Sequence, residues 1–206
     1  MNKLAMMVVL SVAVTAPVAA RAERVRATLT GYEEVPVVST AASGEFVGMI
    51  NRGDQSIDYR LTYTGLQGTV TQAHIHVAQP SVNGSIVIWL CQTGASPGPT
   101  GTAICSPGTG TFTGTITASD VVAGATTSQQ LAAGELDEVI AAMRAGAAYV
   151  NVHTNLSPGG EIRGQIRASN RPMFRLPDAS RLQHRRVRGE QLADAGLGQD
   201  AVDHHD

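Results

Sequence analysis

The chain has 206 residues, a net charge of −2 and an aromatic content of only 4%. So small a charge gives no electrostatic basis for binding nucleic acid or an anionic surface, and the composition excludes both as expected partners. The length fits one domain of about 145 residues between two terminal segments. Its richness in Gly, Thr, Ser and Val favours many short strands joined by turns.

The first 22 residues have the pattern of a secretory signal peptide. Lys3 supplies the positive charge, residues 4–16 form an apolar run, and Ala20-Arg21-Ala22 places small residues where a signal peptidase cleaves. The alternative is a membrane anchor, but the run is shorter than the roughly 20 residues that cross a bilayer. We therefore expect cleavage after Ala22 and a secreted or periplasmic protein with no membrane association.

Alternating apolar and polar residues, separated by Gly, Asn and Pro turn signals, predict a series of strands after this segment. The predicted strands cover residues 24–30, 44–51, 56–64, 71–77, 85–90, 111–117, 149–154 and 160–166. The run 85–90 is apolar on both faces, which indicates a central strand. Residues 134–144 form the one predicted helix, because apolar residues recur there at helical spacing and Gly146 follows as a C-terminal signal. These elements predict an all-β fold with one short helix.

Periodicity stops after Ile166. Residues 169–206 carry scattered Arg and Asp with too few apolar residues for a core, so we expect a disordered tail. The tail ends in His204 and His205, which offer at most a weak metal-scavenging end. The expected organisation is a signal peptide at 1–22, one domain at 23–168 and the tail at 169–206.

The chain has two cysteines, Cys91 and Cys105. In an exported protein the expected state is a disulfide, here closing a loop of about 15 residues that contributes roughly 3 kcal/mol to stability. The alternative is that Cys91 ligates a soft metal ion, although no histidine lies close to it in the sequence.

Three histidines form the main candidate site. His74 and His76 are two residues apart in a predicted strand, so both project from one face, and His153 lies on the polar face of another strand. If the two strands are neighbours, three imidazoles converge, and imidazole is a preferred ligand for Zn and Cu. Three nitrogen ligands with one open position are typical of a reactive or exchangeable centre rather than a closed structural one.

The alternative is a hydrogen-bonded polar network that holds the strands in register without a metal. Asn151 and Glu161 lie on the same predicted face as the histidines and are candidates for fixing the imidazole tautomers. Arg163 is expected to pair with Glu161 rather than to act as a functional cation. Glu33 and Glu34 are adjacent on an extended segment and point apart, so they do not form a catalytic pair. The sequence has no phosphate-binding loop or dinucleotide fingerprint, and its spacing supports no catalytic triad.

Several segments together resemble the CHRD domain family, the module named for chordin. In chain order they are Leu29-Thr30-Gly31-Tyr32-Glu33-Glu34-Val35-Pro36, Leu61-Thr62-Tyr63-Thr64-Gly65-Leu66, Ala73-His74-Ile75-His76, Asn83-Gly84-Ser85-Ile86-Val87-Ile88-Trp89-Leu90, Ala145-Gly146-Ala147-Ala148-Tyr149-Val150-Asn151-Val152-His153-Thr154, and Ser157-Pro158-Gly159-Gly160-Glu161-Ile162-Arg163-Gly164-Gln165-Ile166. The resemblance implies an extracellular antiparallel β-sandwich, Greek-key-like, and no particular reaction. The family's His-x-His and Val-His-Thr positions correspond to His74, His76 and His153.

The sequence therefore predicts an exported CHRD-domain binding module with a transition-metal site, holding one Cu or Zn ion at the three histidines. One alternative is a copper-dependent redox enzyme, since His-x-His on a β-sandwich strand also resembles copper–zinc superoxide dismutases over a few residues. The other alternative is a metal-free interaction or matrix protein with structural histidines. The expected partner is an extracellular protein or matrix component that the sequence does not identify.

Overall fold

The structure is a computed structural model, and it describes residues 22–51 and 53–169. Apart from Ala22 and Ser169, the predicted signal peptide and tail lie outside the described residues. The strands are β1 (Glu23–Thr30), β2 (Ser43–Ile50), β3 (Ile57–Thr64), β4 (Val70–Val77), β5 (Ser85–Cys91), β6 (Gly110–Ile116), β7 (Ala148–Thr154), β8 (Ile162–Gln165) and β9 (Arg167–Ala168). The α-helix is α1 (Leu136–Arg144), and short 3-10 helices occupy Gly31–Glu33, Ala118–Asp120 and Thr127–Gln129.

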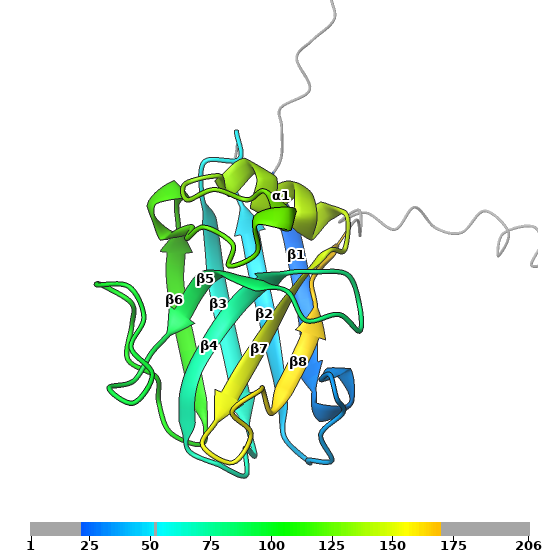
Figure 1. The fold of residues 1–206 in the computed structure, drawn as a ribbon, viewed down its shortest axis with the longest axis vertical. Coiled ribbons are helices and arrows are strands. Elements are labelled where there is room, and N and C mark those ends of the chain that lie inside the picture. The colour runs from blue at the N-terminus through cyan, green and yellow to red at the C-terminus, as the bar shows by residue number, and fades with distance from the viewer. Residues whose placement is uncertain (1–21, 52, 170–206) are drawn as a thin grey trace, which may run out of the picture. The chain divides into compact units, whose positions relative to one another are not determined.

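The strands form one antiparallel, nine-stranded sheet in the order β5-β4-β7-β8-β1-β2-β3-β6, with β9 paired to β1. The sheet folds over on itself into a nearly closed sandwich. In Figure 1 the β5-β4-β7-β8 half lies in front of the β1-β2-β3-β6 half. The predicted all-β antiparallel sandwich is confirmed.

The core lies between the two halves of the sheet. Because successive strand side chains alternate, β1 buries Val25, Ala27 and Leu29 and exposes the residues between them. From the front half, the same core receives Ala73, Ile75, Val150, Val152 and Ile162. Each fully buried aliphatic or aromatic side chain contributes about 1.5–3 kcal/mol by leaving water. The face of β4, β7 and β8 that turns away from this core carries the polar residues.

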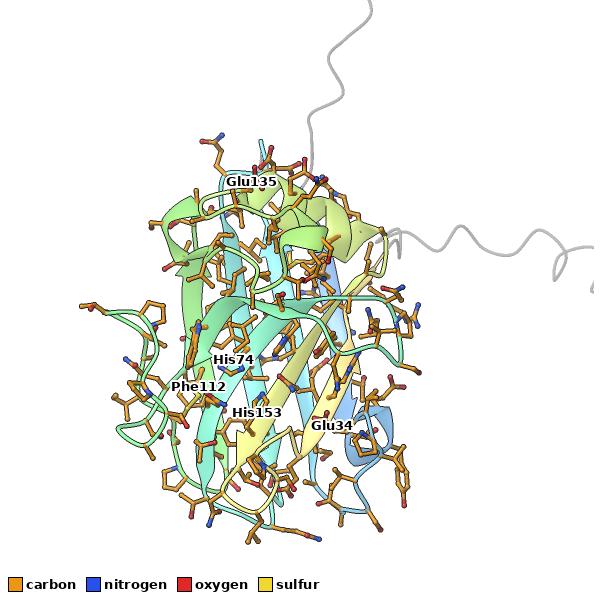
Figure 2. The ribbon with its side chains drawn as sticks, in the orientation of Figure 1. Glu34, His74, Phe112, Glu135 and His153 are labelled. Carbon is orange, nitrogen blue, oxygen red and sulfur yellow. A yellow bond between two sulfur atoms is a disulfide. The ribbon has the colours of Figure 1, made fainter. Side chains whose placement is uncertain are left out.

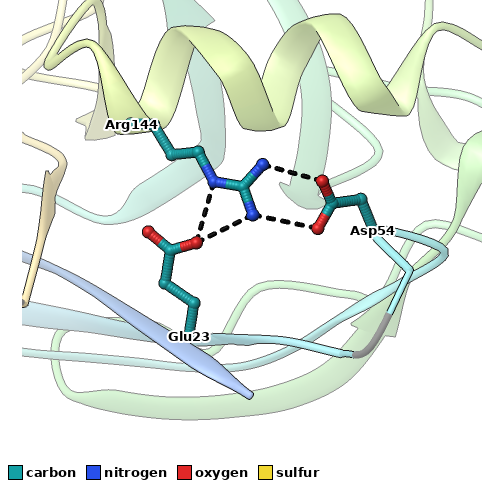
Figure 3. Close-up of polar contacts among 3 residues, drawn as sticks. All are labelled: Glu23, Asp54 and Arg144. Atoms are coloured by element: carbon teal, nitrogen blue, oxygen red, sulfur yellow. Dashed lines mark hydrogen bonds and ion pairs between the residues drawn. The ribbon is translucent and has the colours of Figure 1, made fainter. Parts of the chain in front are cut away.

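Helix α1 begins two residues later than predicted and ends at Arg144, as predicted. Its buried residues, Leu136, Val139, Ile140 and Met143, join the core, which confirms the helical spacing. Figure 3 shows its last residue, Arg144, bonded to Glu23 at the start of β1 and to Asp54 in the β2–β3 turn. The guanidinium donates two bonds of 2.7 and 2.9 Å to Asp54 and one of 2.8 Å to Glu23. These exposed ion pairs hold the helix end with modest energy, about 0–1 kcal/mol each.

The prediction that β5 is a central strand is wrong. β5 pairs only with β4 and stands at one end of the strand order. It is nevertheless largely buried, because Val121 bridges Ile88 across its free edge and the Val122 N–H donates to the Val87 carbonyl at 2.9 Å. A covered edge strand has the same apolar sequence as a central one, so its sequence alone did not separate them.

Cys91 and Cys105 form the predicted disulfide, which excludes a Cys91 thiolate as a metal ligand. The bond joins the end of β5 to the long loop that leads to β6. Across the described ranges, 22–51 and 53–169, no helix has the length and apolarity needed to cross a membrane.

Candidate metal centre

The strands that carry the three histidines are neighbours, as the site prediction required. β4 and β7 pair antiparallel, with His74 opposite Asn151 and His76 opposite Tyr149. Opposed residues in an antiparallel pair project from the same face, so His153, two residues beyond Asn151, joins them. Figure 2 shows His74 and His153 close together on the front of the sheet.

The three rings form a compact cluster. The centroid of the His74 ring lies 5.0 Å from that of His153 and 5.5 Å from that of His76, and the His76 and His153 centroids are 6.4 Å apart. One ligand nitrogen from each residue lies within 4.8 Å of the other two. Imidazoles on one tetrahedral ion, bound at about 2.0–2.1 Å, place their nitrogens about 3.4 Å apart. Small side-chain movements would therefore be enough for all three nitrogens to bind a single ion.

Backbone carbonyls define the tautomers of two of these rings. His76 Nδ1 lies 3.0 Å from the Gly84 carbonyl oxygen, and His153 Nδ1 lies 2.9 Å from that of Pro158. A carbonyl oxygen only accepts hydrogen bonds, so both rings carry their proton on Nδ1 and a lone pair on Nε2. His74 Nδ1 lies 3.3 Å from His153 Nε2 and is then the donor of that pair. His74 and His76 thus present an Nε2 with a free lone pair, whereas the lone pair of His153 Nε2 accepts the bond from His74.

Two of these nitrogens have no partner in the protein. His74 Nε2 and His76 Nε2 are buried, and no described residue bonds to either. A buried acceptor left without a partner costs about 1–3 kcal/mol, and native structures hold few such groups. A metal ion fits this arrangement, because coordination would satisfy both lone pairs at once.

The histidines are buried, with exposed fractions of 0% for His74, 7% for His76 and 6% for His153. Burial, aided by the neighbouring imidazoles, lowers the pKa of His74 to about 2. Burial also lowers the pKa of His76 to about 4 and moves that of His153 below its ordinary value. The three rings are therefore neutral at physiological pH, which is the form that binds metal.

A loop of residues 78–84, here called the covering loop, covers part of the polar face. It is held from below by three side chains. Gln165 Nε2 donates to the Ala78 carbonyl at 2.9 Å, and Arg163 donates to Val82 O at 2.9 Å and to Asn83 Oδ1 at 3.1 Å. The Gly84 N–H donates to the Tyr149 hydroxyl at 3.2 Å. The polar strand face expected from the sequence is therefore an enclosed layer rather than a solvated surface.

Aromatic rings complete the surroundings of the cluster. Trp89 of β5 packs against His74 with ring centroids 4.2 Å apart and planes at 80°. Tyr149 stacks on His76 at 4.7 Å with an interplanar angle of 2°. The sequence analysis assigned Trp89 only to an apolar run, but its place opposite His74 in the β4–β5 register is what brings it to the site.

Of the three predicted supporting residues, Asn151 contacts the histidines, with its Oδ1 3.0 Å from His153 Nε2. With the His153 proton on Nδ1 both of these atoms are acceptors, so this is a close contact rather than a hydrogen bond. Glu161 instead accepts hydrogen bonds from Thr40 Oγ1, the Gln67 and Gly68 N–H groups and Thr154 Oγ1. The expected Glu161–Arg163 pair is wrong, since all ion pairs among the described residues belong to Arg144. Register explains the difference, because Arg163 lies opposite Asn151 and reaches toward the covering loop.

Glu34 is a further member of this region that the sequence analysis missed. Glu33 is exposed and Glu34 is buried, so the two carboxylates do point apart as predicted. Glu34 Oε1 is buried without a hydrogen-bond partner. Burial raises the pKa of Glu34 to about 7, although the positive charge of Arg163 acts in the opposite direction. The residue that makes room for the buried Glu34 carboxyl group is Gly160, because a Cβ at position 160 would collide with it.

A scan of known families connects this geometry with the sequence pattern. The model of the CHRD domain family matches residues 25–166, which include most of β1, all of β2 to β8 and all three histidines. No curated protein and no solved structure gives a significant match. Because the family match covers well over half of the sequence, the chain belongs to the CHRD domain family.

Proposed function

We propose that this protein is an exported metal-binding module that holds one transition-metal ion, Cu or Zn, at His74, His76 and His153. The observation that carries the proposal is the pair of buried, unpartnered Nε2 atoms on His74 and His76. A hydrogen-bonded network alone gives these lone pairs no partner. A shared ion does, and the clustering of three ligand nitrogens within 4.8 Å supports this.

The rings are held for this purpose by groups outside the coordination sphere. The Gly84 and Pro158 carbonyls keep the proton of His76 and His153 on Nδ1, so Nε2 faces the ion. Asn151 lies against His153, with its Oδ1 3.0 Å from Nε2. Glu161 supports His153 indirectly, because it accepts a hydrogen bond from Thr154 Oγ1 and so holds the residue that follows His153. Arg163 secures the covering loop through Val82 and Asn83.

Export is part of the proposal. The signal-like pattern at 1–22 supports it, and so does the Cys91–Cys105 disulfide, because disulfides persist in oxidising compartments. CHRD membership also agrees with an extracellular site of action.

Elemental analysis of the mature, untagged protein tests the metal site. We expect about one Cu or Zn per chain in the wild type and none in the His74→Ala/His76→Ala/His153→Ala variant. The matched control replaces the remaining three histidines, His184, His204 and His205, and should leave the metal content unchanged. Circular dichroism must show that both variants fold.

The chain has a single tryptophan, which gives a second measurement. Because Trp89 packs against His74, copper bound at the cluster should quench its fluorescence with a stoichiometry of one. Wild-type protein that takes up no metal after reconstitution and dialysis would refute the proposal and leave the histidines as a structural network.

A further inference from the structure

Arg163 is a buried cation with no anionic partner within ion-pair distance among the described residues. Its exposed fraction is 1%, and its hydrogen bonds go to the neutral oxygens of Val82 and Asn83. Buried charges in proteins are ordinarily paired, because an isolated charge loses its hydration. The Glu34 carboxyl acts on it from beyond ion-pair distance, and burial raises the pKa of that carboxyl to about 7, so about half of it is protonated near neutrality. The positive charge of Arg163 is therefore only partly compensated.

This charge is directed at the histidine cluster through Tyr149. Arg163 Cζ lies 3.4 Å from the centroid of the Tyr149 ring, and the His76 ring lies parallel to Tyr149 at 4.7 Å. A guanidinium and an imidazole cannot share one face of the ring at these distances, so Tyr149 is sandwiched between them. The guanidinium carbon is then no more than about 8 Å from the centre of the His76 ring, within the range where charges inside a protein interact strongly.

The donors of the cluster do not neutralise a bound ion. The three ligands are neutral imidazoles, and the adjacent polar group is the neutral amide of Asn151. The carboxylate of Glu161 is occupied by four hydrogen bonds elsewhere, and the thiols are joined in the disulfide. A divalent ion here would keep its full charge in a buried environment beside a guanidinium. The desolvation penalty rises with the square of the charge, so a monovalent ion is disfavoured far less.

We propose that the centre selects monovalent copper over divalent copper and zinc, and that Arg163, acting through Tyr149, sets this preference. Cu(I) needs no fourth ligand or anion, because three imidazoles satisfy a trigonal site. Of the metals that imidazole binds well, copper has an accessible monovalent state. The inference rests on the proposed function, since it concerns which ion the three histidines hold.

Competition titrations on the untagged wild-type chain test the preference. Cu(I) is measured anaerobically under a reductant against a chromophoric Cu(I) chelator, and Cu(II) and Zn(II) are measured against chelators of their own. We expect Cu(I) to bind at least about a hundredfold more tightly than either divalent ion. Zn(II) or Cu(II) binding as tightly as Cu(I) would overturn the inference and leave the proposed function standing. No binding of any of the three ions would refute the proposed function itself.

A variant pair tests the role of Arg163. Arg163→Gln removes the charge, and Arg144→Gln removes the same charge from an exposed ion pair at the helix end. The ratio of Cu(I) to Cu(II) affinity should fall about tenfold in Arg163→Gln, equal to about 59 mV in the one-electron potential, and should not change in Arg144→Gln. Arg163→Lys, which keeps the charge, should retain most of the preference. An unchanged ratio in folded Arg163→Gln would refute the role of Arg163. If that variant fails to fold, the wild-type ranking of the three ions still tests the preference for Cu(I), and a ratio in Arg163→Lys that differs from the wild type would count against a role for the charge alone.

Discussion

Gly160 lies directly against the carboxyl group of Glu34, so closely that a Cβ at position 160 would collide with the carboxylate oxygens. Its backbone also has a φ of +126°, which side-chain-bearing residues rarely adopt. The contact joins the turn after β7 to the segment after β1. The same turn supplies the Pro158 carbonyl that fixes the His153 tautomer, so a disturbance at Gly160 is expected to reach the histidine cluster.

Gly160→Ala should therefore weaken both the fold and the site. We expect the free energy of unfolding to fall by about 2 kcal/mol, because the new Cβ adds backbone strain and displaces Glu34. Chemical denaturation measures this loss, and a metal titration should show weaker binding in the same variant. Gly159→Ala is the matched control, since a Cβ there meets nothing within 4 Å. Equal stability of the two variants would contradict the proposed contact.

Glu34 makes stability depend on pH in a defined direction. Its folded pKa of about 7 exceeds the ordinary value of 4.5, so its favourable contribution is complete below pH 4.5 and is lost as pH rises through 7. The Glu34→Gln side chain cannot ionise. Between pH 4.5 and pH 8 the free energy of unfolding of this variant should therefore rise relative to that of the wild type by up to about 3 kcal/mol. Urea denaturation across this range, compared as the difference between variant and wild type, cancels the other titrating groups.

Glu33→Gln is the control for this experiment, because it removes an exposed carboxyl from the neighbouring position. A parallel pH trend in the two variants would show that the burial of Glu34 is not the cause.

Loss of the disulfide should lower stability by about 3 kcal/mol, since Cys91 and Cys105 are 14 residues apart and the bond restricts the unfolded chain. The Cys91→Ala/Cys105→Ala variant and the reduced wild type should unfold at similar denaturant concentrations. A reductant should not affect the double variant, which serves as its own control. Full wild-type stability under strong reduction would contradict the expected contribution.

Asn151→Ala should reduce metal affinity about tenfold to a hundredfold without abolishing binding, because it removes the polar group beside His153 while leaving all three ligands. Competition with a chelator measures the change. Asn51→Ala removes an amide that bonds Ser56 and Asp58 at the far end of β2, and metal affinity should stay the same. Wild-type affinity in Asn151→Ala would restrict Asn151 to a structural role.

Strand positions were predictable from the sequence because half-buried strands alternate, and the turns between them carry Gly, Asn and Pro. The same alternation placed His74, His76 and His153 on the polar faces of their strands. The pairing of β4 with β7 depends on contacts between residues far apart in the chain. The local sequence pattern does not reveal such contacts, so the convergence of the three histidines was predicted only on the condition that the two strands are neighbours.

The features that the sequence analysis missed all depend on such distant contacts. Trp89 reaches His74 through the β4–β5 register, which contains two irregularities that no local pattern reveals. The burial of Glu34 requires the close approach of Gly160. Arg163 was assigned to Glu161 because they are near in sequence, yet its strand position directs it to Val82 and Asn83.

His74 and His153 are 79 residues apart, and nothing but the completed β4–β7 pairing brings them together. Closing so long a segment costs chain entropy, so the three ligand nitrogens come together only in the folded domain. Under the proposed function, a chain exported in the unfolded state would therefore acquire its ion after folding, from its destination compartment. Occupancy of the site would then report that folding is complete.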